Sequence, residues 1–176
     1  MADDRTPCQR DSAAVTPEDR RSVETLEIRR VEITSAVAAD LIAALNGELS
    51  SRYPEEGANH FRLDPEEVVE GRGAFVVAYS GGKPLGCGAI RRMDENTAEI
   101  KRMYVEPSAR ARGVGRAVLR ALEAEARRLE VGRIVLETGE RQLEALALYR
   151  SSGFVRIPAF GEYVGAPLSV CMEKRV

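Results

Sequence analysis

A long amphipathic helix stands between two apolar strands in the second half of the chain, and this unit constrains the fold more than any other feature. The first strand ends before Pro107, and apolar residues then recur at helical spacing from residue 114 to residue 129. Gly132 ends the helix, and residues 134–136 form a short apolar strand. A strand–helix–strand unit joins two parallel neighbours through a right-handed crossover. The rest of the chain must therefore build onto a sheet that contains a parallel pair.

The residues before this unit predict antiparallel pairing. Apolar strands over 74–79 and 85–90 are joined by a tight turn at Gly81-Gly82, and a second turn leads into the next strand. The remaining segments are a strand near 26–31, a helix over 37–49 that Thr34 or Ser35 can cap, a short helix start at 64–67, a helix that ends at Gly153, and strands over 154–157 and 168–172. We therefore expect an α/β fold with a mixed, largely antiparallel central sheet, one parallel pair and helices on both faces.

Length and composition place the chain in one ordinary globular class. Residues 1–23 are polar and lack periodicity, which predicts a disordered N-terminal tail before a single domain over 24–176. The formal net charge is −2, so no overall field attracts nucleic acid or a membrane surface. Neither a signal peptide nor an apolar stretch of membrane-spanning length occurs, and we expect a cytoplasmic protein.

Metal chemistry is not expected. His60 is the only histidine, and the three cysteines are widely spaced without a CxxC pair. Cys87 and Cys171 fall on predicted strands, where small thiols usually pack in the core. We therefore predict no metal site and no catalytic cysteine.

The turn that opens the long helix suits an anion. It reads Arg110-Ala-Arg112-Gly113-Val114-Gly115-Arg116. Unpaired N–H groups and the positive dipole end favour a phosphate at a helix N-terminus, and arginines add charge that phosphates accept well. The spacing is neither that of a dinucleotide-binding fold nor that of a P-loop. The alternative is an exposed turn with two glycines and surface arginines.

Two motifs together resemble the GNAT superfamily of acetyl-CoA-dependent N-acetyltransferases, in particular its small bacterial members. The first, Arg/Gln-x-x-Gly-x-Gly/Ala after a strand, is matched by Arg110, Gly113 and Gly115. The second, Leu-Tyr-x-x-x-Gly-Phe, is matched by Leu148-Tyr149 and Gly153-Phe154. The resemblance covers roughly residues 25–175. It implies that acetyl-CoA is the donor and that the parallel pair of strands splays apart.

The resemblance also implies roles for individual residues. The backbone of the splayed strand would pair with the pantetheine amides, N–H groups at the helix start would hold the diphosphate, and Gln142 would stand where an asparagine is usual. These cofactor-binding positions are Met103, Tyr104, Val105, Arg110, Arg112, Gly113, Val114, Gly115, Arg116 and Gln142. Glu99 would be the general base and Tyr149 the acid that protonates the departing thiolate. The alternatives are a solvent-facing Glu99 paired with Lys101, and a Tyr149 that only fills the core.

The sequence indicates the acceptor less specifically than the donor. The residues expected in or near the walls of the acceptor site are Arg52, His60, Arg62, Arg102 and Arg141. Several arginines suggest an amine that bears a carboxylate, such as an amino acid or another small amino-carboxylate, although solvated surface arginines are the alternative for each. Rival functions are acetylation of a protein N-terminus or lysine, and a non-catalytic domain that binds acyl-CoA as a sensor. The last strand and the loop before it could also form a homodimer interface.

Overall fold

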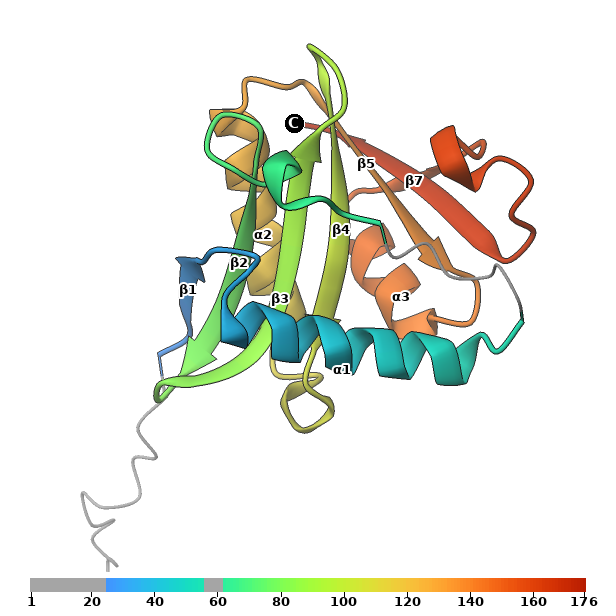
Figure 1. Cartoon of the computed structure of the whole chain (residues 1–176). Helices are drawn as coiled ribbons and strands as arrows, with labels where there is room; N and C mark the ends of the chain where they lie inside the picture. The colour runs from blue at the N-terminus through green and yellow to red at the C-terminus, as the bar shows by residue number, and fades with distance from the viewer. Residues whose placement is uncertain (1–24, 56–61) are drawn as a thin grey trace, which may run out of the picture.

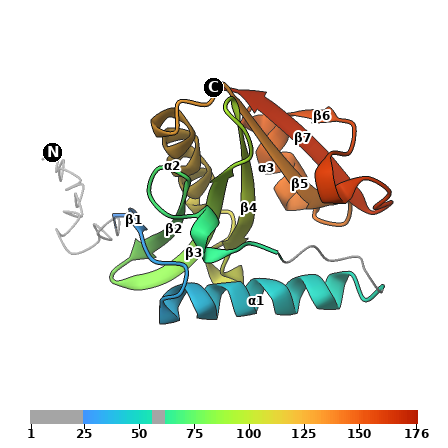
Figure 2. The same ribbon diagram turned by 45° about the horizontal axis from the view of Figure 1, so that its top comes forward.

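The computed structural model describes residues 25–55 and 62–176, which form a mixed seven-stranded sheet with helices on both faces (Figure 1). In spatial order the strands are β1 (Glu27–Arg30), β2 (Gly73–Ser80), β3 (Lys83–Arg92), β4 (Thr97–Val105), β5 (Arg133–Gly139), β7 (Ser169–Arg175) and β6 (Val155–Ile157). Only β4 and β5 pair in parallel, so the predicted fold class is confirmed. Figure 2 shows β6 at the outer edge, beside β7. The predicted tail and His60 lie outside the described residues.

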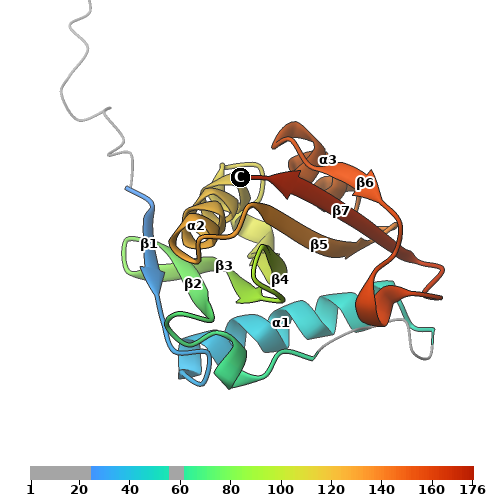
Figure 3. The ribbon, with the colours of Figure 1, turned by 90° about the horizontal axis from the view of Figure 1, so that it is seen from above.

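Three α-helices make the outer layers. α1 (Ala36–Arg52) covers one face of the sheet, and α2 (Val114–Arg128) and α3 (Leu143–Ser151) cover the other, as the view from above shows (Figure 3). Single 3-10 turns occur at η2 (Pro65–Glu67), η3 (Pro107–Ala109) and η4 (Gly161–Tyr163). Across the described parts of the chain, every helix is too short or too polar to cross a membrane.

Each helix packs through the apolar face that its sequence predicts. Of the two predicted caps for α1, the structure uses Ser35, whose hydroxyl accepts a hydrogen bond from the Ala38 N–H at 3.4 Å. Leu41 and Leu45 of α1 pack on one face of the sheet with Phe75 and Val77 of β2. The larger core lies on the opposite face, between the sheet, α2 and α3. Burial of the three helices against one sheet supplies most of the apolar area that stabilises the fold.

The sheet opens where β4 and β5 stop pairing. Their parallel register runs from Thr97 opposite Arg133 to Ile100 opposite Leu136. Beyond that point β4 continues along β3 to Val105, whereas β5 continues along β7, and the two strands diverge in Figure 1. A bulge accompanies the departure of β4, and its Arg102 has a left-handed φ of 58°. The opening exposes the edge of β4 to the helices on one face and to α1 on the other.

Candidate active site

A cavity of about 780 Å³ occupies the opening of the sheet. It is walled by the end of β4, the start of α2, one side of α3 and the C-terminal half of α1. Its lining residues are Leu45, Glu48, Arg52, Met103, Tyr104, Val105, Arg110, Ala111, Gly113, Val114, Gly115, Arg116, Gln142, Glu144, Ala145, Ala147, Leu148, Tyr149 and Ser151. Most cofactor-binding positions predicted from sequence thus meet in one cavity. Arg112 is exposed and does not line it.

The two glycines of the turn before α2 have different structural roles, and both suit an anion site. Gly113 is the N-cap of α2 with φ 85°, a left-handed conformation that glycine adopts at little cost. It offers no side chain to cap the first turn, so the N–H groups of that turn face the cavity uncapped. Gly115 instead allows close packing, because a Cβ there would lie 3.3 Å from Leu148 Cδ2 and 3.5 Å from Val105 Cγ2.

Arg110 is held in place by two elements. Its Nε donates to the Val105 carbonyl oxygen at 3.0 Å, and its Nη2 donates to Glu48 Oε2 at 2.5 Å. The other oxygen of Glu48 accepts from Arg52 Nη2 at 3.0 Å, one helical turn along α1. Glu48 therefore ties α1 to the turn before α2. The sequence alone does not indicate this residue, because its partner lies 62 positions away.

Tyr149 of α3 also lines the cavity. Its side chain is buried between α3 and the sheet and packs near Phe154, with ring centroids 5.8 Å apart. Burial raises the pKa of Tyr149, and the negative charge of Glu137 raises it further. The phenol therefore stays protonated at neutral pH and can donate a proton. Gln142 is the N-cap of α3 and lines the same cavity.

Residues 38–154 match the profile of the acetyltransferase (GNAT) family, which is more than half of the chain. The chain belongs to the GNAT family of acetyltransferases. An IAA acetyltransferase of Azospirillum brasilense is 42% identical over 135 residues, which are 76% of this chain and 87% of that protein. A solved structure from Klebsiella pneumoniae subsp. pneumoniae, assigned as an acyl-CoA N-acyltransferase, is 34% identical with a TM-score of 0.73, and the match covers 86% of this chain and 98% of that one.

More distant GNAT structures share the fold. An acetyltransferase of Elizabethkingia anophelis, solved with acetyl-CoA bound, is 17% identical with a TM-score of 0.62 over 86% of this chain and 98% of that one. The predicted family, enzyme class and acyl donor are thereby confirmed: the chain is an acetyl-CoA-dependent N-acetyltransferase. Among residues 25–55 and 62–176, no group of three or more His, Cys, Asp or Glu side chains could hold a metal ion.

The uncapped start of α2 and its arginines fit a diphosphate, and the edge of β4 that lines the cavity fits a pantetheine arm. Arg116 on the first turn of α2 donates from Nη2 to Ser151 Oγ at 2.9 Å, and this hydrogen bond ties α2 to α3. The edge of β4 at Met103 and Val105 has no parallel neighbour there, because β5 has diverged. Backbone groups of such an edge can pair with amides of a ligand.

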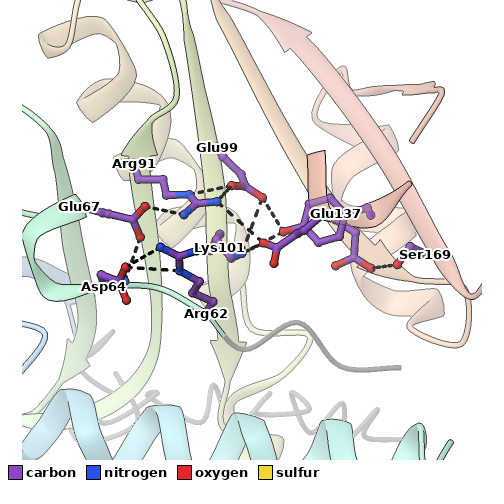
Figure 4. Close-up of polar contacts among 10 residues, drawn as sticks. Arg62, Asp64, Glu67, Arg91, Glu99, Lys101, Glu137 and Ser169 are labelled. Atoms are coloured by element: carbon purple, nitrogen blue, oxygen red, sulfur yellow. Dashed lines mark hydrogen bonds and ion pairs between the residues drawn. The ribbon is translucent and has the colours of Figure 1, made fainter. Parts of the chain in front are cut away.

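Glu99 is fully enclosed, so the solvent-facing alternative for this residue is wrong. Its exposed fraction is 0%. Oε2 accepts from Arg91 Nε at 2.8 Å and pairs with Arg91 Nη2 at 2.7 Å. Oε1 accepts from the Tyr163 hydroxyl at 2.6 Å, and Lys101 Nζ lies 4.0 Å away. Figure 4 shows Glu99 bonded to Arg91, with Lys101 nearby. Both carboxylate oxygens therefore already have partners, and Glu99 does not line the cavity.

Tyr163 is the second residue that the sequence analysis missed. Burial raises the pKa of this phenol, and the adjacent Glu99 raises it further. Lys101 Nζ donates to the Tyr163 oxygen at 3.0 Å and to Glu162 Oε1 at 2.8 Å. Tyr163 belongs to η4, so the loop before β7 closes over the α1 face of the sheet at this point. The hydrophobic pattern around residue 163 gives no sign of a partner on β4.

The structure does not gather the predicted acceptor arginines into one wall. Arg62 is exposed and pairs with Asp64 at 3.1 Å. Arg141 pairs with Glu55 at 2.5 Å. Arg102 donates from Nη1 to the amide oxygen of Asn46 at 2.9 Å, and burial lowers the pKa of its guanidinium. Arg52 lines the cavity, whereas Arg62, Arg102 and Arg141 do not.

Cys87 and Cys171 are buried, as predicted for core thiols. Burial raises the pKa of Cys87 to about 12, and its thiol donates to the Arg102 carbonyl oxygen at 3.4 Å. A thiol with so high a pKa is a poor nucleophile at neutral pH.

Proposed function

We propose that the protein moves the acetyl group of acetyl-CoA to the primary amine of a small molecule by direct attack. The observation that carries this proposal is a single cavity that joins the start of α2 to Tyr149 along the edge of β4. A donor laid along it would have its diphosphate at one end and its thioester beside the phenol. Effective transfer needs both ends fixed at once, because orientation accounts for much of the lowering of the barrier.

The predicted cofactor positions have distinct tasks in this proposal. N–H groups of Val114, Gly115 and Arg116 would hold the diphosphate, with Arg110 and Arg116 as its charged neighbours. The backbone of residues 103–105 would pair with the pantetheine arm. When bound, acetyl-CoA supplies the activated acetyl thioester. Arg112 points to solvent and would contribute long-range charge only.

We infer that Tyr149 protonates the departing thiolate, because its phenol is buried in the cavity wall and remains protonated at neutral pH. The attacking ammonium must also lose a proton. The role of Glu99 as that base stays a prediction. The enclosure of its carboxylate by Arg91 and Tyr163 is the observation against it.

For the acceptor we propose a small amino-carboxylate, such as an amino acid. Of the predicted arginines that the structure describes, Arg52 lines the cavity, where it pairs with Glu48 at 3.0 Å. An acceptor carboxylate that enters the cavity would meet this guanidinium.

An acceptor panel tests this proposal. Amino acids are compared with the matching amines that lack the carboxylate, and with peptides bearing a free N-terminus or a lysine, while release of the CoA thiol is followed. The proposal expects amino acids to react at least about 10-fold faster than their decarboxylated partners, since a charge-assisted pair contributes more than 1.4 kcal/mol. Faster reaction of peptides would indicate a protein acetyltransferase. Tight acetyl-CoA binding without turnover of any amine would indicate a sensor domain.

A further inference from the structure

Tyr104 of β4 lies in the wall of the cavity, and its hydroxyl is not used by the fold. The residue is more than nine-tenths buried, with an exposed fraction of 7%, and it lines the cavity. Among residues 25–55 and 62–176 the hydroxyl has no hydrogen-bond partner, and the guanidinium carbon of Arg110 lies 6.0 Å from the ring centroid. Because nearly enclosed polar groups normally have a partner, this oxygen indicates a ligand in the cavity.

The side chains at the end of β4 divide between the two faces of the sheet. Met103 and Val105 pack against the core that contains α2, whereas Tyr104 packs with Leu45 of α1 in the core on the opposite face. Figure 3 shows α1 on one side of the sheet and α2 and α3 on the other. The opening therefore has a donor side, with Tyr149 and the turn before α2, and an α1 side, on which Tyr104 lies.

One face of α1 completes the wall on this second side. Leu45, Glu48 and Arg52 line the cavity at intervals of three and four residues, as neighbours along one helix face do. Glu48 already accepts hydrogen bonds from Arg52 and Arg110. A guanidinium has no acceptor atom, so the phenol oxygen of Tyr104 is the group on this wall that can accept a hydrogen bond from an incoming amine.

We propose that the Tyr104 hydroxyl binds the amine of the acceptor on the α1 side of the opening, an inference that rests on the proposed function. With the pantetheine arm paired to the backbone of residues 103–105, the donor occupies the other side, and the amine must approach the thioester from the α1 side. The phenol oxygen accepts from one N–H and leaves the lone pair of the neutral amine free to attack. The acceptor carboxylate would at the same time meet Arg52.

The hydroxyl acts as a neutral hydrogen-bonding group and not as the base of the transfer. Burial raises the pKa of Tyr104, and Glu106 and Glu48 raise it further against an opposing effect of Arg110. The phenol therefore keeps its proton near pH 7. Its contribution is to orient the attacking nitrogen, which lowers the barrier without any transfer of charge to the residue.

Tyr104→Phe removes the hydroxyl and keeps the ring. Tyr79→Phe is the matched control, because Tyr79 also packs on the α1 side and has a guanidinium, that of Arg29, 4.8 Å from its ring centroid. KM and kcat are measured with the fastest amino acid of the acceptor panel and with its decarboxylated amine. Titration calorimetry gives the Kd for acetyl-CoA, and the Kd of the same amino acid for protein saturated with CoA.

We expect Tyr104→Phe to raise KM about 10-fold for both the amino acid and the amine, since both present the same nitrogen to the hydroxyl. The Kd of the amino acid for the CoA-bound protein should rise by the same factor. A contact present before and during attack changes KM more than kcat, so kcat should stay within about threefold of wild type. Acetyl-CoA affinity should be kept, and Tm should stay within about 2 °C, because no hydrogen bond of the fold is lost.

The other outcomes overturn the role of Tyr104. An unchanged acceptor KM removes it, and weaker acetyl-CoA binding with acceptor KM kept would assign the hydroxyl to the donor. A rise in KM for the amino acid but not for the amine would assign it to the acceptor carboxylate. A large fall in Tm, or failure to fold, would show that the hydroxyl is bonded within the protein. Wild-type protein that binds acetyl-CoA but acetylates no amine contradicts the proposed function itself, and the role of Tyr104 with it.

Discussion

Replacing Tyr163 with phenylalanine removes one oxygen atom from the centre of the buried polar network. That oxygen donates to Glu99 at 2.6 Å and accepts from Lys101 at 3.0 Å. Its surroundings exclude water, because Tyr163, Glu99 and Lys101 are all buried. After the change, Glu99 keeps Arg91, but one of its oxygens loses its hydrogen-bond donor.

The expected cost follows from these contacts. A hydrogen bond to a charged group contributes about 1.5–3 kcal/mol, and leaving the acceptor unsatisfied costs its desolvation. Lys101 also loses an acceptor, but it keeps its hydrogen bond to Glu162 at 2.8 Å, so this loss costs less free energy of unfolding. We therefore expect Tyr163→Phe to lower the free energy of unfolding by about 2–3 kcal/mol, or Tm by roughly 5–10 °C for a protein of this size.

Urea and thermal unfolding measure this cost at pH 7. Tyr79→Phe is the matched control, because Tyr79 is half-buried at the end of β2 and its ring lies under Arg29. The control should change stability by less than about 0.5 kcal/mol. A loss of the same small size for Tyr163→Phe would refute the reasoning, since the buried oxygen would then contribute no more than a half-exposed one.

Three further changes test the cavity and the core. Gly113→Ala should cost about 1–2 kcal/mol of stability in urea unfolding, because φ is 85° and no atom stands within 4 Å of the new Cβ, so the strain is purely conformational. Gly115→Val should instead raise the Kd for CoA about 10-fold or more in titration calorimetry, since the new Cβ alone would lie 3.3 Å from Leu148 Cδ2 and the two methyl groups beyond it must displace that side chain. Cys87 has a folded pKa of about 12, above its unfolded value of about 8.5, so its contribution to stability is complete below pH 8.5 and is lost as pH rises toward 12. Cys87→Ala should therefore flatten the fall in stability above pH 8.5, and an unchanged slope would contradict this.

Much of the fold could be predicted because it is encoded locally. The helical spacing after Val114, the turn at Gly81-Gly82 and the cap at Ser35 each depend on neighbours within a few residues. The parallel pair followed from the strand–helix–strand unit alone. The residues of α1 and those of α2 pack in different cores, which agrees with the expected helices on both faces.

The site could be predicted only where a motif is contiguous. The turn at Arg110 and the Leu148-Tyr149 pair meet in one cavity. The environment of Glu99 could not be predicted from the sequence, because it depends on Arg91 of β3 and on Tyr163, which lies 64 residues further along the chain. The acceptor arginines do not gather in one wall: Arg141 pairs with the distant Glu55, whereas Arg52 and Arg62 pair with neighbours along the chain.

The stoichiometry of acetyl transfer tests the central claim most directly. Purified protein is incubated with acetyl-CoA and with the best acceptor of the amine panel, while the released thiol and the acetylated amine are both quantified. We predict one CoA thiol for each acetylated amine, no release above hydrolysis without the amine, and a large loss of both products in Tyr149→Phe. Thiol release that does not depend on the amine, or that yields no acetylated product, would contradict the account.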